Sequence, residues 1–338
     1  MPTTLSICIP TFNRAQCLAE LLDSIVEQGT PDVEVVVSDD ASSDNTAEVI
    51  ANYKSRLPRV KFLQQPWNIG LDRNFLAAVD NASGDYVWLM GDDDKLLPGA
   101  VEKVLTALAG WPDIVGMTVG VIDYDREFQA ATGMRKMPPT ARISGAEAVF
   151  SSVAELLGFM STLVFNRSMW GVVCREDPVL DYENYYIQVY IIGRMMQRFG
   201  DWGILNDACV GYRSNNDQLQ TKFGWLERLK IDVIAYEQIA NGLFAGLPSV
   251  RRTMIRRIFS THVLSRIRIA KTRSEPTQGF WTATRFLYGH YKSVPAFWYS
   301  ALPTLLLPKW LMRTVRVAYQ RYSSSSGTQR AKRALRGS

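Results

Sequence analysis

Two groups of adjacent carboxylates are the residues of this 338-residue chain whose types and spacing most directly suggest chemistry. The letters SDD close an apolar stretch at residues 33–40, and GDDD closes another at residues 85–94. Three consecutive carboxylates repel one another, and a divalent cation would compensate that repulsion. A site made only of oxygen ligands favours Mg²⁺ or Mn²⁺, which usually completes its shell with water and substrate phosphates. The alternative is a solvated turn, in which aspartate is simply a good loop former.

The elements that would position these carboxylates alternate between strand and helix. Apolar stretches predict strands at residues 5–10, 33–37, 60–63 and 85–90. Apolar residues at helical spacing predict helices near 18–26, 49–53 and 71–81, and Pro98 is expected to open a fourth helix. Such alternation is typical of a parallel α/β sheet that binds ligands beyond the carboxyl ends of its strands. Both acidic groups and the TFNR turn are therefore expected to meet in one crevice.

The chain also resembles a known enzyme family. The stretches IPTFNR, VVVSDDASSDNT, NIGLDRN and ASGDYVWLMGDDDKLLP occur in the order and spacing of family 2 glycosyltransferases with the GT-A fold, over residues 4–125. The form Gly-Asp-Asp-Asp is similar to the abequosyltransferase-like subgroup of O-antigen enzymes. The resemblance implies a Rossmann-like, mainly parallel α/β sheet flanked by helices. Neither a dinucleotide-binding G-x-G-x-x-G loop nor a Walker A motif is present.

The resemblance assigns nucleotide contacts to the matching residues. Pro10 and Phe12 match a turn that packs against the base, Asp40 matches the acid that contacts the base, and Asp92 is the expected ribose contact. For two of the implied contacts, Arg73 and Arg213, the alternative is an ordinary surface arginine. The full predicted set of nucleotide-sugar-binding residues is Pro10, Phe12, Arg14, Asp40, Arg73, Asp92 and Arg213.

A divalent cation, Mn²⁺ or Mg²⁺, is implied as cofactor. Asp93, five residues before Pro98, matches the principal metal ligand, and Asp94 is predicted to bind the metal beside it. Gly91 stands where the family often has the first aspartate of the pattern, so this chain departs from the family there. The cation would neutralise charge that develops on the nucleoside diphosphate leaving group.

The acceptor hydroxyl needs a general base, and the pattern leaves two candidates for it. Arg194 and Gly200 fit the end of the family's stretch that carries this base. Counting back from them, the expected aspartate falls near Gln188, which cannot act as a base. Asp181 and Glu183 lie one to two helical turns earlier and are equal candidates. Their alternative is an acidic first turn that favours the dipole of the following helix.

The reaction that the resemblance implies is transfer of a single sugar, with inversion, from a nucleotide-diphosphate sugar to a glycan or lipid-linked acceptor in bacterial surface polysaccharide assembly. The chain lacks the Q-x-x-R-W string of the processive members. A nucleotidyltransferase is a second hypothesis, but it would normally show a Gly- and Lys-rich loop near the first strand. A basic nucleic-acid-binding protein is a third, but no recognition motif appears and the acids would have no role. No nucleic-acid partner is therefore expected.

Charge is distributed unevenly along the chain. Residues 251–338 hold 18 Lys and Arg against one acid, a balance of +17, whereas residues 1–250 hold 20 bases and 32 acids, a balance of −12. The uncharged stretch 294–308 is broken by prolines and is shorter than the roughly 20 residues of a membrane span. A helical subdomain with a soluble basic face is one interpretation. The other is an interfacial anchor on an anionic membrane, formed by Trp298, Tyr299, Lys309, Trp310, Arg313 and Arg316.

These patterns predict a catalytic domain at 1–220, a helical basic region at 221–322 and a disordered end at 323–338. Four cysteines without C-x-x-C and two histidines argue against a disulfide framework or a zinc site. The first residues lack the pattern of a signal peptide. We therefore expect a cytoplasmic protein, peripheral at the inner face of the plasma membrane. The oligomeric state is left open.

Overall fold

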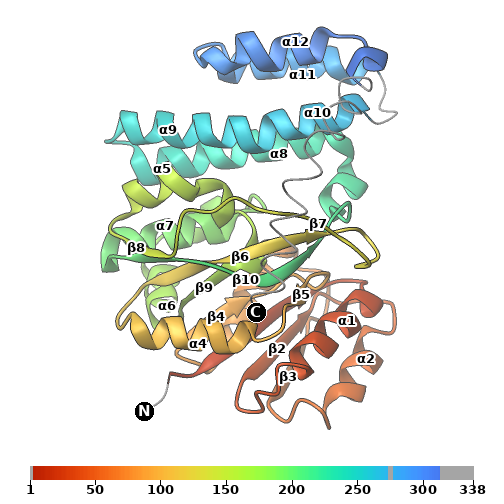
Figure 1. Ribbon diagram of the computed structural model, residues 1–338, viewed down its shortest axis with the longest axis vertical. Helices are drawn as coiled ribbons and strands as arrows, with labels where there is room; N and C mark the ends of the chain where they lie inside the picture. Colours follow the sequence, from red (N-terminus) through yellow and green to blue (C-terminus); the bar gives the residue numbers. More distant parts are fainter. Residues whose placement is uncertain (1–2, 273–276, 313–338) are drawn as a thin grey trace. The chain divides into compact units, whose positions relative to one another are not determined.

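The computed structural model describes residues 3–272 and 277–312 (Figure 1). The chain divides into two compact units, of which the first ends at Asn216 and the second begins at Asp217. The predicted disordered end at 323–338 lies outside the described residues, as do Arg313 and Arg316 of the predicted membrane anchor.

One mixed, mostly parallel sheet forms the centre of the first unit. Its strands lie in the order β3-β2-β1-β4-β9-β6-β10-β5, with β7 paired to β6 and β8 paired to β10. The strands predicted in the first 90 residues are present and mutually parallel. They are β1 (Leu5–Thr11), β2 (Glu34–Asp39), β3 (Val60–Gln64) and β4 (Tyr86–Leu89).

The second half of the sheet is partly antiparallel. Strand β9 runs antiparallel between β4 and β6, and β10 runs parallel to β6. The sequence pattern does not predict β6, although its first seven residues are buried. It also misses three strands of two to four residues, which are too short to carry a periodic signal. The strands of this half are β5 (Lys95–Leu96), β6 (Gly116–Tyr124), β7 (Ala131–Met134), β8 (Ala141–Ile143), β9 (Leu163–Asn166) and β10 (Trp202–Arg213).

Both faces of the sheet are covered by helices. Ile7 and Ile9 of β1 belong to an apolar cluster that includes Leu18 and Leu22 of α1. Cys8 lies between them, and its thiol donates to the carbonyl of Ala78 in α3 at 3.5 Å. Because successive side chains of a strand point to opposite faces, α1 and α3 lie on opposite sides of the sheet. Burial on both faces explains why these strands read as continuous apolar stretches.

Seven α-helices belong to the described part of the first unit, and Figure 1 shows α1 and α2 together beside β2 and β3. The expectation that Pro98 opens a helix is wrong, because α4 begins at Ala100. Gly99 makes the turn between them with a φ of +70°, a conformation that favours glycine. The helices are α1 (Ala15–Val26), α2 (Thr46–Tyr53), α3 (Leu71–Asp80), α4 (Ala100–Gly110), α5 (Ala146–Leu157), α6 (Arg167–Glu176) and α7 (Ile187–Phe199).

The second unit is helical and has its own apolar core, which includes Trp225, Phe259 and Phe280. Asp232 is buried in this unit, and its carboxylate pairs with Arg228 and Arg266. The described helices are α8 (Gln218–Phe244), α9 (Pro248–Ile258), α10 (Leu264–Thr272), α11 (Thr277–Tyr291) and α12 (Leu302–Leu306), with π-helical turns at Phe259–Val263 and Phe297–Ala301.

The uncharged stretch 294–308 does not form one long helix. It contains a π-helical turn followed by α12, and Pro303 lies in the first turn of α12, where a missing N–H costs nothing. Within the described part of the chain, no helix combines the length and the apolar character that crossing a bilayer requires.

Candidate active site

The carboxyl ends of β1, β2 and β4 bring the predicted segments together. The hydroxyl of Thr11, the last residue of β1, donates to Asp92 Oδ2 at 2.8 Å. The carbonyl of Thr11 accepts from the backbone N–H of Asp40 at 2.9 Å. The expectation that the TFNR turn and both acidic groups lie at one edge of the sheet is therefore confirmed.

Arg14 is the cation at the centre of the acidic group. Its Nη1 lies 3.1 Å from Asp92 Oδ1 and 2.9 Å from Asp93 Oδ2, and its Nη2 donates to the carbonyl of Asn216 at 2.9 Å. Burial would lower the pKa of Arg14, but the two carboxylates raise it overall. Burial also raises the pKa of Asp92, although Arg14 opposes this. The arginine therefore compensates part of the repulsion that the three aspartates create.

Asp93 is held by residues from the C-terminal end of the first unit. Its Oδ2 accepts from Asn216 Nδ2 at 2.7 Å, and its carbonyl accepts from Arg213 Nε at 2.9 Å. The guanidinium of Arg213 also donates to the carbonyl of Arg126 at 2.6 Å and to Glu20 at 2.7 Å. Arg213 is thus a buried residue beneath the acidic group and not a surface arginine. Sequence reasoning missed Asn216, which no pattern marks.

Asp94, like Asp92 and unlike Asp93, is buried, and protein donors surround its carboxylate. Its Oδ2 accepts from the hydroxyl of Ser161 at 2.5 Å, and its Oδ1 accepts from the backbone N–H of Arg213 at 3.1 Å. Burial raises the pKa of Asp94 well above its usual range, and Asp93 adds to this. Metal binding by Asp94 stays a prediction, and it would require the carboxylate to exchange partners.

The donor set suits a cation that arrives with phosphates. Among the described residues, no three His, Cys, Asp or Glu side chains are arranged to hold a metal ion. The Asp93 side chain is 17% exposed and lies at the edge of the sheet. Mg²⁺ is commonly bound by one or two carboxylates together with substrate phosphates, so it needs no cage made by protein alone. The residues fit such an ion and do not fit one bound without a nucleotide.

Asp40 is buried and fastened to the loop before α3. Its two carboxylate oxygens accept from the backbone N–H groups of Ile69 at 2.6 Å and Gly70 at 3.1 Å. Gly70 has a φ of +90°, which side-chain-bearing residues rarely adopt, so this loop geometry favours glycine at the position. Of the two residues predicted to pack against the nucleotide base, Pro10 is buried within β1 and Phe12 is exposed.

The first turn of α3 also contacts the segment that carries Asp181 and Glu183, the two predicted general bases. Arg73 makes a two-bond contact with Glu183, with Nε–Oε1 at 2.5 Å and Nη2–Oε2 at 3.2 Å. Asp181 is exposed in a short 3₁₀ turn at Val179–Tyr182. The structure therefore brings Arg73 and Glu183 together, within a few residues of the loop that holds Asp40.

Asp72 is a residue that the sequence patterns do not single out. Its side chain is buried, and its Oδ2 accepts from the backbone N–H of Tyr185 at 2.7 Å. Tyr185 has a φ of +72°, an uncommon value for a residue other than glycine. Burial raises the pKa of Asp72 to about 6. Asp72 therefore fixes the backbone of the segment that carries Glu183.

Comparison with known proteins agrees with this geometry. The model of the glycosyl transferase family 2 matches residues 6–159. An abequosyltransferase of Salmonella typhimurium is 30% identical over 265 residues, which cover 73% of this chain and 78% of the relative. A GalNAc(5)-diNAcBac-PP-undecaprenol β-1,3-glucosyltransferase of Campylobacter jejuni is 40% identical over 114 residues, 33% of this chain and 37% of that protein.

Solved structures show the same fold. S. aureus TarS 1–349 in complex with UDP-GlcNAc has a TM-score of 0.60 at 15% identity, covering 94% of this chain and 92% of that one. The mannosyltransferase PcManGT of Pyrobaculum calidifontis, in complex with GDP-Man and Mn²⁺, has a TM-score of 0.53 at 14% identity, covering 93% and 88%. The expected GT-A type α/β fold is therefore confirmed. The chain is a glycosyltransferase that belongs to glycosyl transferase family 2.

Proposed function

We propose that this enzyme transfers a single sugar, with inversion, from a nucleotide-diphosphate sugar to a hydroxyl of a glycan or lipid-linked acceptor in the presence of Mn²⁺ or Mg²⁺. The observation that carries the proposal is the group formed by Arg14, Asp92 and Asp93 at the carboxyl edge of the sheet. This is where open α/β sheets bind their ligands. Family membership favours this reaction over nucleotidyl transfer or nucleic-acid binding.

The nucleotide would bind along the edge that Asp40 and Phe12 form. A carboxylate has about four acceptor positions, and Asp40 uses two for Ile69 and Gly70, so it can still accept an N–H of the base. Phe12 is exposed and available to pack against the base. Pro10 fixes the strand end that leads into this turn. A carboxylate already held by two backbone groups needs no rearrangement to meet the ligand.

Phosphate and metal would meet at Asp93. Asp93 would hold the cation together with the donor diphosphate, and Asp94 is the second proposed ligand. The ion supplies compensation for the negative charge of the leaving group. Arg14 lies beside Asp93 and brings a second positive charge to the same place. The contacts of Arg213 with the Asp93 carbonyl support a role in positioning Asp93.

Asp181 and Glu183 remain the two proposed general bases. The Arg73 guanidinium occupies both carboxylate oxygens of Glu183, so Glu183 would have to give up this contact before it takes a proton from the acceptor. An incoming donor that attracted Arg73 toward its phosphates would release Glu183. Asp181 is exposed, and Arg73 pairs with Glu183 and not with it. The proposal thus predicts different behaviour of the two acids when Arg73 is changed.

For the acceptor, we propose a chemical class and not one molecule. One relative is named for an undecaprenol-diphosphate-linked saccharide and another for the transfer of abequose. We propose a related acceptor in the assembly of a bacterial surface polysaccharide. The enzyme would act at the inner face of the plasma membrane, where the basic second unit meets anionic lipid.

A nucleotide panel tests the donor site directly. The melting temperature would be measured with UDP, GDP, CDP and dTDP, each with and without Mn²⁺ or Mg²⁺. A ligand at one hundred times its Kd stabilises the folded protein by about 2.7 kcal/mol, which is easily detected. We expect one diphosphate to stabilise selectively, and only with metal. The Asp93→Asn variant is the control and should lose the metal-dependent part. Equal shifts with all four, or none with any, would refute the proposal.

A further inference from the structure

Arg14 closes a ring of contacts around the carboxylate of Asp93. Its Nη1 lies 2.9 Å from Asp93 Oδ2, and its Nη2 donates to the carbonyl of Asn216 at 2.9 Å. The side-chain amide of Asn216 donates in turn to the same Asp93 Oδ2 at 2.7 Å. One carboxylate oxygen therefore meets two donors that are also joined to each other.

The guanidinium of Arg14 is held by a further carboxylate as well. Its Nη1 also lies 3.1 Å from Asp92 Oδ1, and the hydroxyl of Thr11 donates to the other oxygen of Asp92 at 2.8 Å. The Arg14 and Asp93 side chains are 12% and 17% exposed, so salt screens their attraction less than it screens that of a surface pair. Arg14 is thus the positive charge around which these two aspartates are arranged.

A divalent cation on Asp93 would compete with this guanidinium. Mg²⁺ lies about 2.1 Å from its oxygen ligands, so an ion on Asp93 Oδ2 would be no more than about 5 Å from Arg14 Nη1. Two positive charges at that separation repel each other, and Oδ2 already faces the donors of Arg14 and Asn216. The cation can bind tightly to this oxygen only if Arg14 gives up its contact with Asp93.

We infer that Arg14 makes metal binding at Asp93 depend on the donor diphosphate, an inference that rests on the proposed function. The diphosphate gives the planar guanidinium a second anionic partner, to which it can donate two parallel hydrogen bonds. Arg14 exchanges the aspartates for the phosphates, and Asp93 becomes free to hold the ion together with the same phosphates. By linkage, metal and diphosphate strengthen each other's binding, and the metal alone binds weakly.

Binding of Mn²⁺ without nucleotide is the first measurement. Electron paramagnetic resonance detects free Mn²⁺ in solution, so the measurement needs no turnover. The Arg14→Met variant lacks the competing charge and should bind Mn²⁺ at least about ten-fold more tightly than the parent protein, because a hydrogen bond to a charged group contributes about that factor. Equal or weaker binding of Mn²⁺ by a folded Arg14→Met variant would overturn the inference.

Binding of the nucleoside diphosphate should change in the opposite direction. With saturating Mn²⁺, calorimetry should show that Arg14→Met binds the diphosphate selected by the nucleotide panel about ten-fold more weakly, because its contact with the phosphates is lost. A purely structural Arg14 would weaken both ligands together, and an arginine that only binds phosphate would leave Mn²⁺ binding unchanged. Either result would overturn the inference.

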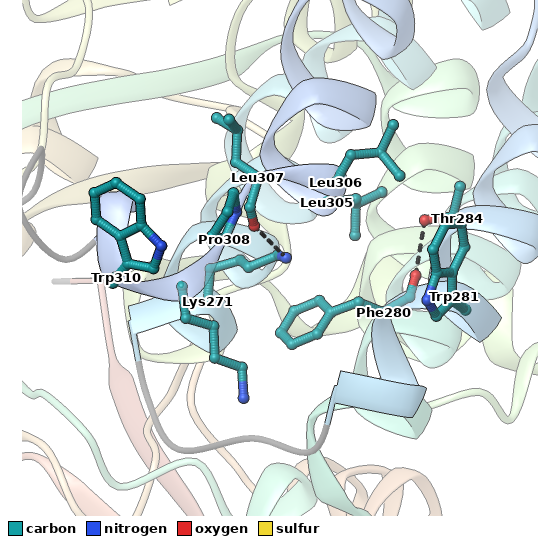
Figure 2. Close-up of a pocket in the computed structure, with 10 residues that line it drawn as sticks. Lys271, Phe280, Trp281, Thr284, Leu305, Leu306, Leu307, Pro308 and Trp310 are labelled. Carbon is teal, nitrogen blue, oxygen red and sulfur yellow. Dashed lines mark hydrogen bonds between the residues drawn. The ribbon is translucent and has the colours of Figure 1, made fainter.

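Two control variants remove one cation each and leave the contacts of Asp93 in place. Lys95 pairs with Glu20 at 2.9 Å and with neither Asp92 nor Asp93. Lys271 lies in the second unit at a cavity of about 380 Å³, where its Nζ donates to the Leu307 carbonyl at 2.9 Å (Figure 2). Lys95→Met and Lys271→Met should bind Mn²⁺ as the parent does. A gain in either that equals the gain in Arg14→Met would show that charge alone controls the ion, and would overturn the inference.

Melting temperatures without ligand show which variants are folded. Should Arg14→Met fail to fold because buried Asp92 has lost its partner, Arg14→Gln takes its place. Its amide can still donate to Asp92 but carries no charge, so tighter Mn²⁺ binding is again expected, and an affinity equal to that of the parent would overturn the inference.

The parent protein separates this inference from the proposed function. If the parent binds no nucleoside diphosphate in the presence of Mn²⁺, the proposed function fails and the inference fails with it. If the parent binds both ligands and the Arg14 variants show no gain in Mn²⁺ affinity, the inference alone fails.

Discussion

Replacing Asp72 with asparagine should change how the stability of the protein depends on pH. Burial raises the pKa of Asp72 from 3.8 to about 6, and the nearby charge of Glu183 acts in the same direction. Backbone N–H donors, including that of Tyr185, oppose the rise. The folded state thus binds the Asp72 proton more tightly than the unfolded state does.

The sign and size of the effect follow from linkage. A folded pKa above the unfolded value means that the free energy of unfolding falls as the pH rises through the window from 3.8 to about 6. At about 1.4 kcal/mol per pKa unit, the complete loss is about 3 kcal/mol, of which about 2 kcal/mol falls between pH 4.5 and 7.5. Asparagine does not titrate, so the Asp72→Asn variant should lack this loss.

Urea unfolding, followed by tryptophan fluorescence at both pH values, measures the difference. Relative to the parent protein, Asp72→Asn should gain about 2 kcal/mol between pH 4.5 and pH 7.5. The exposed Asp32→Asn variant is the control and should show no comparable gain. Identical pH dependence in parent and Asp72→Asn would refute the reasoning, because it would mean that burial does not control this carboxyl.

The same residue has a predicted effect on turnover. Asp72→Ala removes the acceptor for the Tyr185 N–H, whereas Asp72→Asn keeps a side-chain oxygen that can accept it. We expect a lower kcat for Asp72→Ala, little change in donor KM, and partial rescue in Asp72→Asn. If the alanine variant folds and turns over normally, Asp72 does not position the segment that carries Glu183.

Four further predictions concern the rest of the first unit. Asp93→Ala should abolish metal-dependent transfer while the melting temperature without ligand stays near that of the parent; near-normal turnover at saturating donor and metal would exclude Asp93 as a ligand. Asp40→Asn should weaken nucleoside diphosphate binding by about 1.5–3 kcal/mol in calorimetry, the range for a hydrogen bond to a charged group, and unchanged affinity would make Asp40 structural. One of Asp181→Asn and Glu183→Gln should lower kcat by roughly 10²–10⁴-fold with little effect on donor affinity, and normal turnover in both would place the base elsewhere. For Glu34, burial raises the pKa, but hydrogen-bond donors from Lys61, Ser6 and Ser83 outweigh it and lower the pKa from 4.5 to about 2. The charged carboxylate therefore contributes about 3 kcal/mol to the free energy of unfolding above pH 4.5, and this contribution is lost as the pH falls toward 2. In urea unfolding, Glu34→Gln should be less stable than the parent at pH 7 and should approach it at low pH, and equal stability at both pH values would contradict this.

Sequence patterns located the parts of the site that depend on strand direction. Asp40 and Asp93 each follow a buried, β-branched or aromatic stretch, and parallel strands place such ends at one edge. That argument needs only local periodicity, which the first four strands carry clearly. It fails for β6, whose buried residues include glycines and a threonine, and for the antiparallel β9, whose direction no local pattern encodes. The early half of the sheet was therefore predictable, as were β9 and β10 as strands, whereas β6 and the direction of β9 were not.

The environment of each predicted side chain was decided only by tertiary structure. Sequence alone determined that acids and a TFNR turn would meet, but not that Arg14 would lie between Asp92 and Asp93. Nor did it determine that Asn216, 123 residues after Asp93, would hold that carboxylate, or that Arg213, predicted as a nucleotide contact with a surface arginine as the alternative, would be buried beneath it. Such contacts join segments that are distant in the chain, so they depend on how the sheet closes, and residue spacing carries no record of that.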